Sequence, residues 1–175
     1  AQRNAATHAA GRWRSIRTLD SGHAVTAIRS TGQAVVSFSS NDYLGLSQHQ
    51  RVIQAAQMAL GDYGAGSGSA RLIVGSRAIH DQMEAALAVW TERESALLFP
   101  TGFQANMGVI GALTTAASSP GCVVYSDALN HASIIDGIRA ARSQVQVYRH
   151  NDLDHLASLM AEHRNSPALV VTDAV

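Results

Sequence analysis

The chain has 175 residues, of which 46% are hydrophobic, and this is enough for one ordinary globular core. Its thirteen basic residues balance thirteen acidic ones, so the net charge gives no reason to expect a nucleic acid or an acidic membrane surface as a partner. All thirteen basic residues are arginine, so the chain offers no lysine amine for covalent catalysis.

The single cysteine, Cys122, excludes an intrachain disulfide and is typical of a reducing compartment. No apolar run has the length of a membrane-spanning helix, and the arginine-bearing N-terminus lacks the apolar stretch of a signal peptide. We therefore expect a cytoplasmic protein. The eight histidines do not have the close spacing of a ligand set, so no metal site is expected.

Residues 1–46 are expected to form an N-terminal helix and hairpin segment. Residues 2–18 have the pattern of an arginine-studded helix. Two alternating runs, 25–29 and 34–39, flank a polar turn as the strands of a β-hairpin do. A second polar turn, 40–46, closes this segment.

Three arginines surround Trp13 in the first predicted helix, and they have two interpretations. They form a solvated basic face, or one of them is a guanidinium fork for a substrate carboxylate. The residues are Arg12, Arg14 and Arg17.

A Gly/Ser-rich stretch, 61–75, separates a predicted helix at 49–60 from a second helical pattern. We interpret the glycines as backbone that comes close to a ligand or another chain. The alternative is a flexible linker. The second pattern places apolar residues on one stripe, which predicts a helix with one buried face; they are Ile79, Met83, Ala86, Leu87 and Trp90.

From residue 94 onwards, strands and helices alternate regularly. This alternation predicts an α/β fold with crossover units and a mostly parallel sheet flanked by helices on both faces. Asn151 is the expected N-cap of the last helix. The predicted strands are 95–99, 122–126, 145–149 and 168–172, and the predicted helices are 102–113, 131–142 and 152–163.

The strand-to-helix turn Thr101-Gly102-Phe103 is the best candidate for a phosphate site. Gly102 lets the backbone approach a ligand, Thr101 adds a hydroxyl, and the helix adds unpaired N–H groups and its positive end. The alternative is that Gly102 only makes the turn. The turn has neither the P-loop spacing nor the dinucleotide glycine pattern, so it does not indicate nucleotide binding.

His131 begins a predicted helix, where the helix dipole opposes protonation, so we expect a neutral imidazole. A neutral ring can stack on a flat conjugated cofactor and exchange a hydrogen bond with it. The alternative is a helix cap or a surface residue.

Several stretches in chain order together resemble the α-oxoamine synthase family of pyridoxal-phosphate (PLP) enzymes, in its 8-amino-7-oxononanoate synthase branch. The resemblance covers nearly the whole chain. Its residues are 38–46 (FSSNDYLGL), the glycine stretch ending in 71–75 (RLIVG), His80 with Met83-Glu84, 98–106 (LFPTGFQAN), 126–133 (SDALNHAS) and 170–173 (VVTD).

The resemblance implies the PLP-dependent transferase fold type I, with residues 47–175 as the incomplete first part of the large PLP-binding domain. It implies that the backbone amides of Gly102 and Phe103 bind the cofactor phosphate. His131 would stack on the pyridine ring and contact substrate as a catalytic residue. Arg14 falls where the family places its carboxylate-binding arginine, with Arg12 as the alternative.

The implied reaction condenses L-alanine with pimeloyl-CoA or a pimeloyl-carrier protein to 8-amino-7-oxononanoate, in biotin biosynthesis, in a homodimer. The chain ends just after a strand-like run, so we expect a piece of a longer protein. The lysine that holds the cofactor covalently would follow Val175, and we expect no turnover from this chain alone. The alternatives are glycine C-acetyltransferase (2-amino-3-ketobutyrate CoA ligase), another α-oxoamine synthase, or a non-catalytic fold-type-I homologue.

Overall fold

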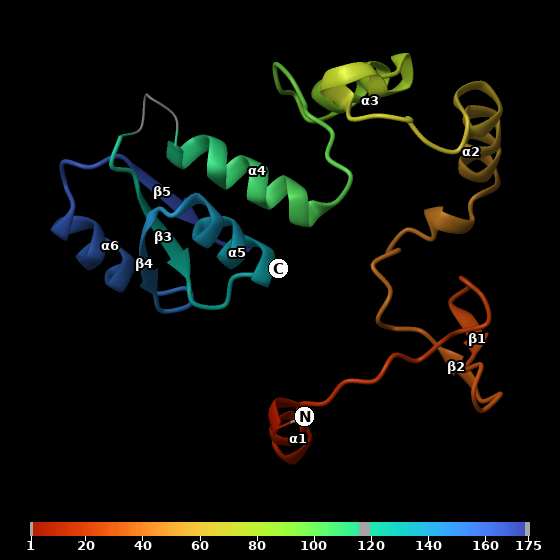
Figure 1. The fold of residues 1–175 in the computed structure, drawn as a ribbon, viewed down its shortest axis with the longest axis horizontal. Helices are drawn as coiled ribbons and strands as arrows, with labels where there is room; N and C mark the ends of the chain where they lie inside the picture. The colour runs from red at the N-terminus through yellow and green to blue at the C-terminus, as the bar shows by residue number, and fades with distance from the viewer. Residues whose placement is uncertain (1, 116–119, 174–175) are drawn as a thin grey trace. The chain divides into compact units, whose positions relative to one another are not determined.

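The computed structural model describes residues 2–115 and 120–173 (Figure 1). The chain divides into two compact units, residues 1–78 and 79–175, and each is described by itself. The functional division predicted after residue 46 stays a prediction. No helix in the described parts of the chain is both long and apolar enough to cross a membrane.

The first unit contains short elements joined by long connections. The predicted hairpin is confirmed, with β1 and β2 antiparallel and Val25 opposite Val36. The elements are α1 (Gln2–Ala9), β1 (Val25–Ala27), β2 (Ala34–Val36), the 3₁₀ turn η1 (Leu46–Gln48), α2 (Gln50–Tyr63) and the π-helical turn η2 (Arg71–Gly75).

The first helix is shorter than predicted. It ends at Ala9, and Gly11 then takes a left-handed conformation with φ of 63°. Trp13 turns back and stacks on His8, with ring centroids 4.1 Å apart and planes at 18°. The extension of the helix to residue 18 is therefore wrong, because a left-handed glycine and an aromatic pair end it early.

The second unit contains a three-stranded parallel sheet in the order β4-β3-β5, which confirms the predicted α/β fold. Val123 of β3 lies opposite Gln144 of β4 and Ala168 of β5. The elements are α3 (Ala78–Trp90, which begins at the boundary of the units), α4 (Gly102–Thr115), β3 (Val123–Asp127), α5 (Ala132–Ala141), β4 (Gln144–Tyr148), α6 (Leu153–Glu162) and β5 (Ala168–Val171).

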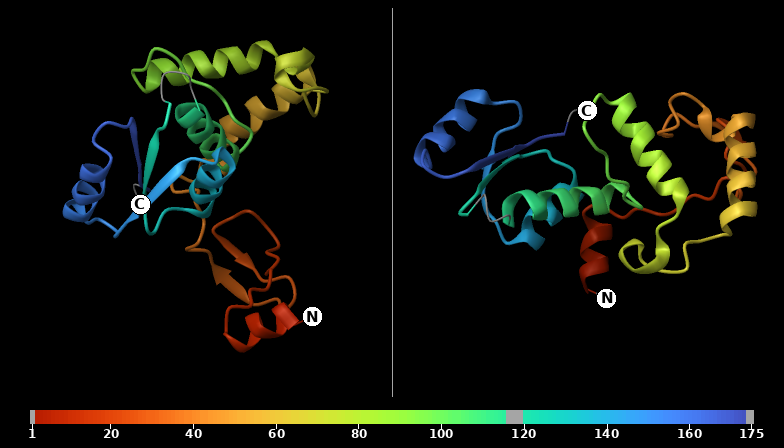
Figure 2. Two further views of the ribbon diagram at one scale, coloured as in Figure 1. Left: turned by 60° about the vertical axis from the view of Figure 1, so that its left-hand side comes forward. Right: turned by 90° about the horizontal axis from the view of Figure 1, so that it is seen from above.

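The central strand β3 is buried on both faces, because its side chains alternate between two helical layers. Val124 packs with residues of α4 and α5, whereas Val123 and Tyr125 pack towards α6. Figures 1 and 2 show α4 and α5 on one side of the sheet and α6 on the other.

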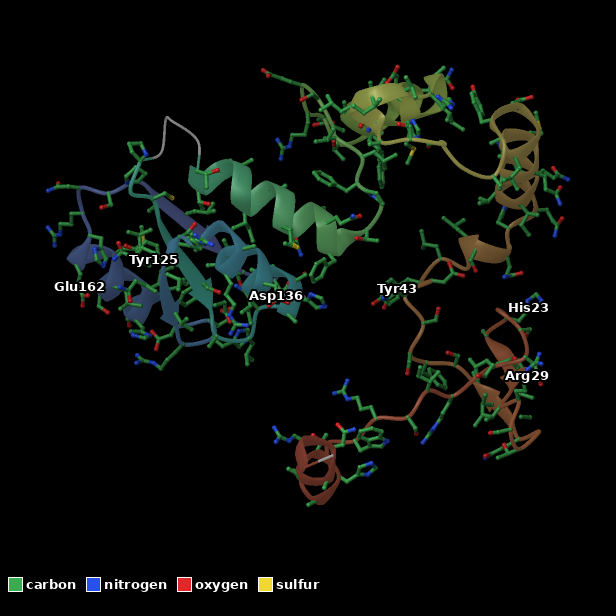
Figure 3. All side chains as sticks on the ribbon, viewed as in Figure 1. His23, Arg29, Tyr43, Tyr125, Asp136 and Glu162 are labelled. Atoms are coloured by element: carbon green, nitrogen blue, oxygen red, sulfur yellow. The ribbon has the colours of Figure 1, made fainter. Side chains whose placement is uncertain are left out.

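Tyr125 is the largest fully buried side chain of the second unit. Burial raises the pKa of its phenol, and the Glu162 carboxylate at the end of α6 raises it further. Figure 3 labels both residues. The phenol therefore stays neutral and serves the α6 side of the core as a packing group.

Three further predictions about elements are wrong. Residues 95–99 form no strand, because the N–H of Leu98 donates to the Glu84 carboxylate at 2.7 Å instead of to a strand partner. The stripe on α3 is not buried within the described chain, since Trp90 is 80% exposed and Met83 45%. The N-cap of α6 is Asp152 rather than Asn151.

Asp152 takes the cap position because its carboxylate accepts the N–H of His155 at 2.8 Å. Asn151 instead adopts a left-handed conformation with φ of 56°, one residue before the cap.

Candidate active site

The first turn of α4 presents two backbone N–H groups that no described residue accepts. Thr101 caps the helix: its hydroxyl accepts the N–H of Gln104 at 3.1 Å, and its carbonyl accepts the N–H of Ala105 at 3.0 Å. The amides of Gly102 and Phe103 lie inside this capped turn, where a helix has no carbonyl for them. These N–H groups and the helix dipole can bind an anion.

Gly102 has open space in front of it. A Cβ built at this position meets no other atom within 4 Å, and its φ is not positive. Neither backbone conformation nor packing against the described residues therefore requires glycine at this position. Glycine at this position is explained if a group from outside the chain comes close to the backbone here.

His131 is the N-cap of α5, as the predicted start of this helix indicated. Its backbone has φ of −55° and ψ of 145°, outside the helical region, and its ring nitrogen Nδ1 accepts the N–H of Ser133 at 3.1 Å. Nδ1 is therefore the edge of the ring that faces the first turn of α5. The residue is exposed, so the ring face is accessible.

A hydrogen bond brings the starts of α4 and α5 together. The amide Nδ2 of Asn106 donates to Oγ of Ser133 at 2.8 Å. Asn106 lies about one helical turn after Gly102, and Ser133 lies two residues after His131. The predicted phosphate turn and the predicted ring-stacking histidine therefore lie side by side, while their roles stay predictions.

Asp127, at the carboxyl end of β3, organises the loop that leads to His131. Its carboxylate accepts the N–H of Leu129 at 2.8 Å and of Asn151 at 3.3 Å, and Nδ1 of His150 lies 2.9 Å from it. The Leu129 hydrogen bond is the largest of the causes that lower the pKa of Asp127, and those from His150 and Asn151 add to it against an opposing effect of burial. This carboxylate joins the β3–α5 and β4–α6 loops.

A second carboxylate holds His131 from the end of β5. Oδ2 of Asp173 accepts the backbone N–H of His131 at 2.6 Å, and the N–H of Asp173 donates to Oδ1 of Asn130 at 2.9 Å. The amide of Asn130 also donates to the carbonyl of Val171. The turn before α5 is thereby fixed to β5.

The sequence interpretation did not assign Asp127, Asp173 or Asn106 to the site. One signal was present: polar residues follow the carboxyl ends of β3, β4 and β5, where open parallel sheets bind ligands. Arg14 and Arg12 belong to the other unit, where both are exposed, so their carboxylate-binding role stays a prediction.

A hollow of about 260 Å³ lies beside α5 but does not include the predicted site residues. Its walls are mainly apolar side chains of β4 and α5, with the end of β3 at one side. It is a feature of the sheet edge; its lining residues are Ser126, Asp127, Ala128, Ile135, Ile138, Arg139, Val145 and Val147.

Comparisons with known proteins identify close relatives by sequence. An 8-amino-7-oxononanoate synthase of Alkalilimnicola ehrlichii is 45% identical over 171 residues, which are 98% of this chain and 43% of that protein. A synthase of the same name from an Anaeromyxobacter species is 49% identical over 144 residues, or 82% of this chain and 35% of its own length. The chain thus spans less than half the length of these relatives.

Solved structures give the same fold. A serine palmitoyltransferase of Sphingomonas wittichii superimposes with a TM-score of 0.82 at 28% identity, over 97% of this chain and 42% of that one. An 8-amino-7-oxononanoate synthase of Francisella tularensis superimposes with a TM-score of 0.59 at 26% identity. The match covers 76% of this chain and 35% of that one. The aminotransferase class I and II family matches residues 33–175, which include the capped turn and His131. The chain therefore belongs to the aminotransferase class I and II family.

Proposed function

We propose that the protein carrying this chain is a PLP-dependent enzyme of biotin biosynthesis. It condenses L-alanine with pimeloyl-CoA or a pimeloyl-carrier protein to 8-amino-7-oxononanoate, with release of carbon dioxide and the thiol carrier. The observation that carries this proposal is the 45% identity to a protein named for that product, extending over 98% of the chain. The chain spans 43% of that relative, so the activity is proposed for the whole protein.

The residues at the start of α4 suit the phosphate of PLP. The amides of Gly102 and Phe103 bind the dianion, and the open space at Gly102 admits it. The exposed ring of His131 stacks on the flat pyridine. When bound, PLP supplies an electron sink for the α-carbon of the amino acid, while the protein positions and orients it.

The substrate carboxylate is assigned to the guanidinium of Arg14, with Arg12 as the alternative. A planar guanidinium binds a carboxylate through two parallel hydrogen bonds, which orients it as well as attracting it. The proposal includes a homodimer and a cytoplasmic location; the buried free thiol of Cys122 is compatible with a reducing compartment.

A second candidate is an acyltransferase of the serine palmitoyltransferase type. The high TM-score of 0.82 favours it, whereas its 28% identity is well below the 45% of the synthase. Sequence identity is the stronger discriminator here, because related enzymes with different substrates share one fold. A third candidate is an enzyme that condenses glycine with acetyl-CoA, and the experiment below includes this pair of substrates.

The test crosses three amino acids with three thioesters on the purified full-length protein with PLP. L-Alanine, glycine and L-serine are each combined with pimeloyl-CoA, acetyl-CoA and palmitoyl-CoA, and products are identified by mass spectrometry. We expect 8-amino-7-oxononanoate from alanine and pimeloyl-CoA as the main product. A main product from serine and palmitoyl-CoA, or from glycine and acetyl-CoA, would replace the proposal.

The 175-residue chain alone is the matched control, because it contains no lysine. We expect it to give no condensation product with alanine and pimeloyl-CoA. Turnover by this chain would contradict the need for a lysine amine.

A further inference from the structure

A chain of three hydrogen-bonding groups ends on the imidazole of His131. Asn106 Nδ2 lies 2.8 Å from Ser133 Oγ, and Ser133 Oγ lies 2.7 Å from His131 Nδ1. Ser133 is only 1% exposed, so its hydroxyl has little access to water. The polarity of this chain determines which ring nitrogen carries the proton.

The amide of Asn106 sets that polarity. An amide nitrogen only donates, so Ser133 Oγ accepts from Asn106 and directs its own proton to His131 Nδ1. The backbone N–H of Ser133 also points at Nδ1, at 3.1 Å. A proton on Nδ1 would face the Ser133 N–H, which can only donate, and would leave the buried hydroxyl proton without an acceptor.

The backbone of His131 is fixed independently. Its N–H donates to Asp173 at 2.6 Å, so the ring is held at both its main chain and its Nδ1 edge. Nε2 has no hydrogen-bond partner among residues 2–115 and 120–173. That nitrogen is the free edge of the ring of an exposed residue.

We propose that Asn106 and Ser133 are positioning residues that hold His131 in the neutral tautomer protonated at Nε2. A ligand at the starts of α4 and α5 then meets one hydrogen-bond donor and no positive charge at this ring. The ligand class is a flat molecule with an acceptor atom, such as a carboxylate oxygen, within reach of Nε2. The ligand contact rests on the proposed function, whereas the tautomer rests on the hydrogen bonds alone.

The test is NMR of the 15N-histidine-labelled protein without added cofactor, since the two ring nitrogens differ in shift when only one is protonated. The His131→Asn variant assigns the signals. We expect Nε2 protonated and Nδ1 unprotonated in the unsubstituted protein. A proton on Nδ1 would overturn the proposal.

Asn106→Asp is the decisive variant, because it keeps the shape and reverses the polarity. The new carboxylate accepts the Ser133 hydroxyl proton, so Ser133 Oγ becomes an acceptor towards the ring. We expect the share of His131 rings with a protonated Nδ1 to rise, while the Ser133 N–H, which still points at Nδ1, keeps the shift incomplete. An unchanged His131 spectrum would overturn the role of Asn106.

His155 is the internal control. Its Nδ1 accepts the N–H of Arg149 at 3.0 Å in a loop of β4 and α6, so its signals stay constant in a folded variant. Ser133→Ala is the second variant. It removes only the hydroxyl donor, and we expect a mixture of tautomers at His131; a pure Nε2 tautomer there would contradict the role of Ser133.

The two proposals fail separately. The expected tautomer without any condensation product would refute the proposed function and leave the positioning role intact. Condensation of alanine with Nδ1 protonated would refute the positioning role and leave the function intact.

Discussion

Gly102 allows phosphate binding to be tested without disturbing the fold. A Cβ at this position meets no atom within 4 Å, so Gly102→Ala keeps the stability of the protein. The methyl group occupies the space in front of the helix amides and weakens a charge-assisted hydrogen bond. We expect PLP affinity to fall about tenfold, or about 1.4 kcal/mol, in a spectrophotometric titration.

Gly111→Ala is the matched control, since an added Cβ there also meets nothing within 4 Å but lies later in α4. It should leave PLP affinity unchanged and stabilise the helix by about 0.5–1 kcal/mol. Equal PLP affinity in both variants would remove Gly102 from the phosphate site.

Asp127 makes the stability of the folded protein depend on pH in the acid range. Hydrogen bonds from Leu129, His150 and Asn151 lower the pKa of its carboxyl in the folded state. A lowered pKa adds stability above the unfolded value of about 3.9, and this stability is lost as pH falls through the folded pKa. The unfolding free energy should therefore decrease with acid, and less steeply in Asp127→Asn.

Urea unfolding from neutral pH down to about pH 3 measures this slope. Asp136→Asn is the control, because Asp136 is about half exposed and pairs only loosely with Arg139, at 3.5 Å. Parallel acid slopes for Asp127→Asn and the unsubstituted protein would contradict the prediction.

At the scale of single residues, the sequence predicted where His131 stands but not what holds it. A histidine before a helical run following a β-strand is visible in the sequence. Asp173, which accepts its N–H, is 42 residues away, and Asn106, which bonds to the neighbouring Ser133, is 25 residues away. Only the fold brings these residues together. Short polar side chains have no periodic signal, so their pairing could not be predicted.

At the scale of elements, the contact between α4 and α5 depends on Gly137. A Cβ there would lie 3.1 Å from Cδ1 of Ile110 and 3.3 Å from the carbonyl oxygen of Asn106. Gly137→Val overpacks this contact, and we expect a loss of about 1–3 kcal/mol of unfolding free energy. Gly111→Val is the same substitution in open space and should cost much less.

Thermal unfolding of both valine variants checks this prediction. The Gly137 variant should also weaken PLP binding, because the displaced segment of α4 carries Asn106. Equal stability of the two variants would contradict the prediction, because it would show that α4 and α5 can move apart at Gly137 without loss of unfolding free energy.

The strand–helix alternation predicted the parallel sheet correctly, because strands that alternate with helices form crossover units, and only the central strand β3 is buried on both faces. Residues 95–99 have the same apolar pattern and form no strand. Their amides need a neighbouring strand, and Leu98 instead donates to Glu84. The local apolar pattern cannot distinguish a strand from an extended connection, because the difference depends on whether a neighbouring strand is present to accept the backbone hydrogen bonds.

At the scale of the whole molecule, the two hydrophobic clusters of the described residues both belong to the second unit. In the first unit, Ile16, Phe38 and Leu72 are each more than 90% exposed. Exposed apolar side chains such as these are available to pack against other protein surface. We expect the full-length protein to sediment as a dimer in analytical ultracentrifugation, and a monomer at micromolar concentration would contradict the proposed homodimer.

The bond between Asp173 and His131 also orders events during protein synthesis. The chain emerges from the ribosome N-terminus first, so α4, β3 and α5 are available before β5. The backbone of His131 stays untethered until residue 173 has been made and β5 has paired with β3. During synthesis, the hydrogen bond that holds the backbone of His131 therefore forms only after β5 has joined the sheet.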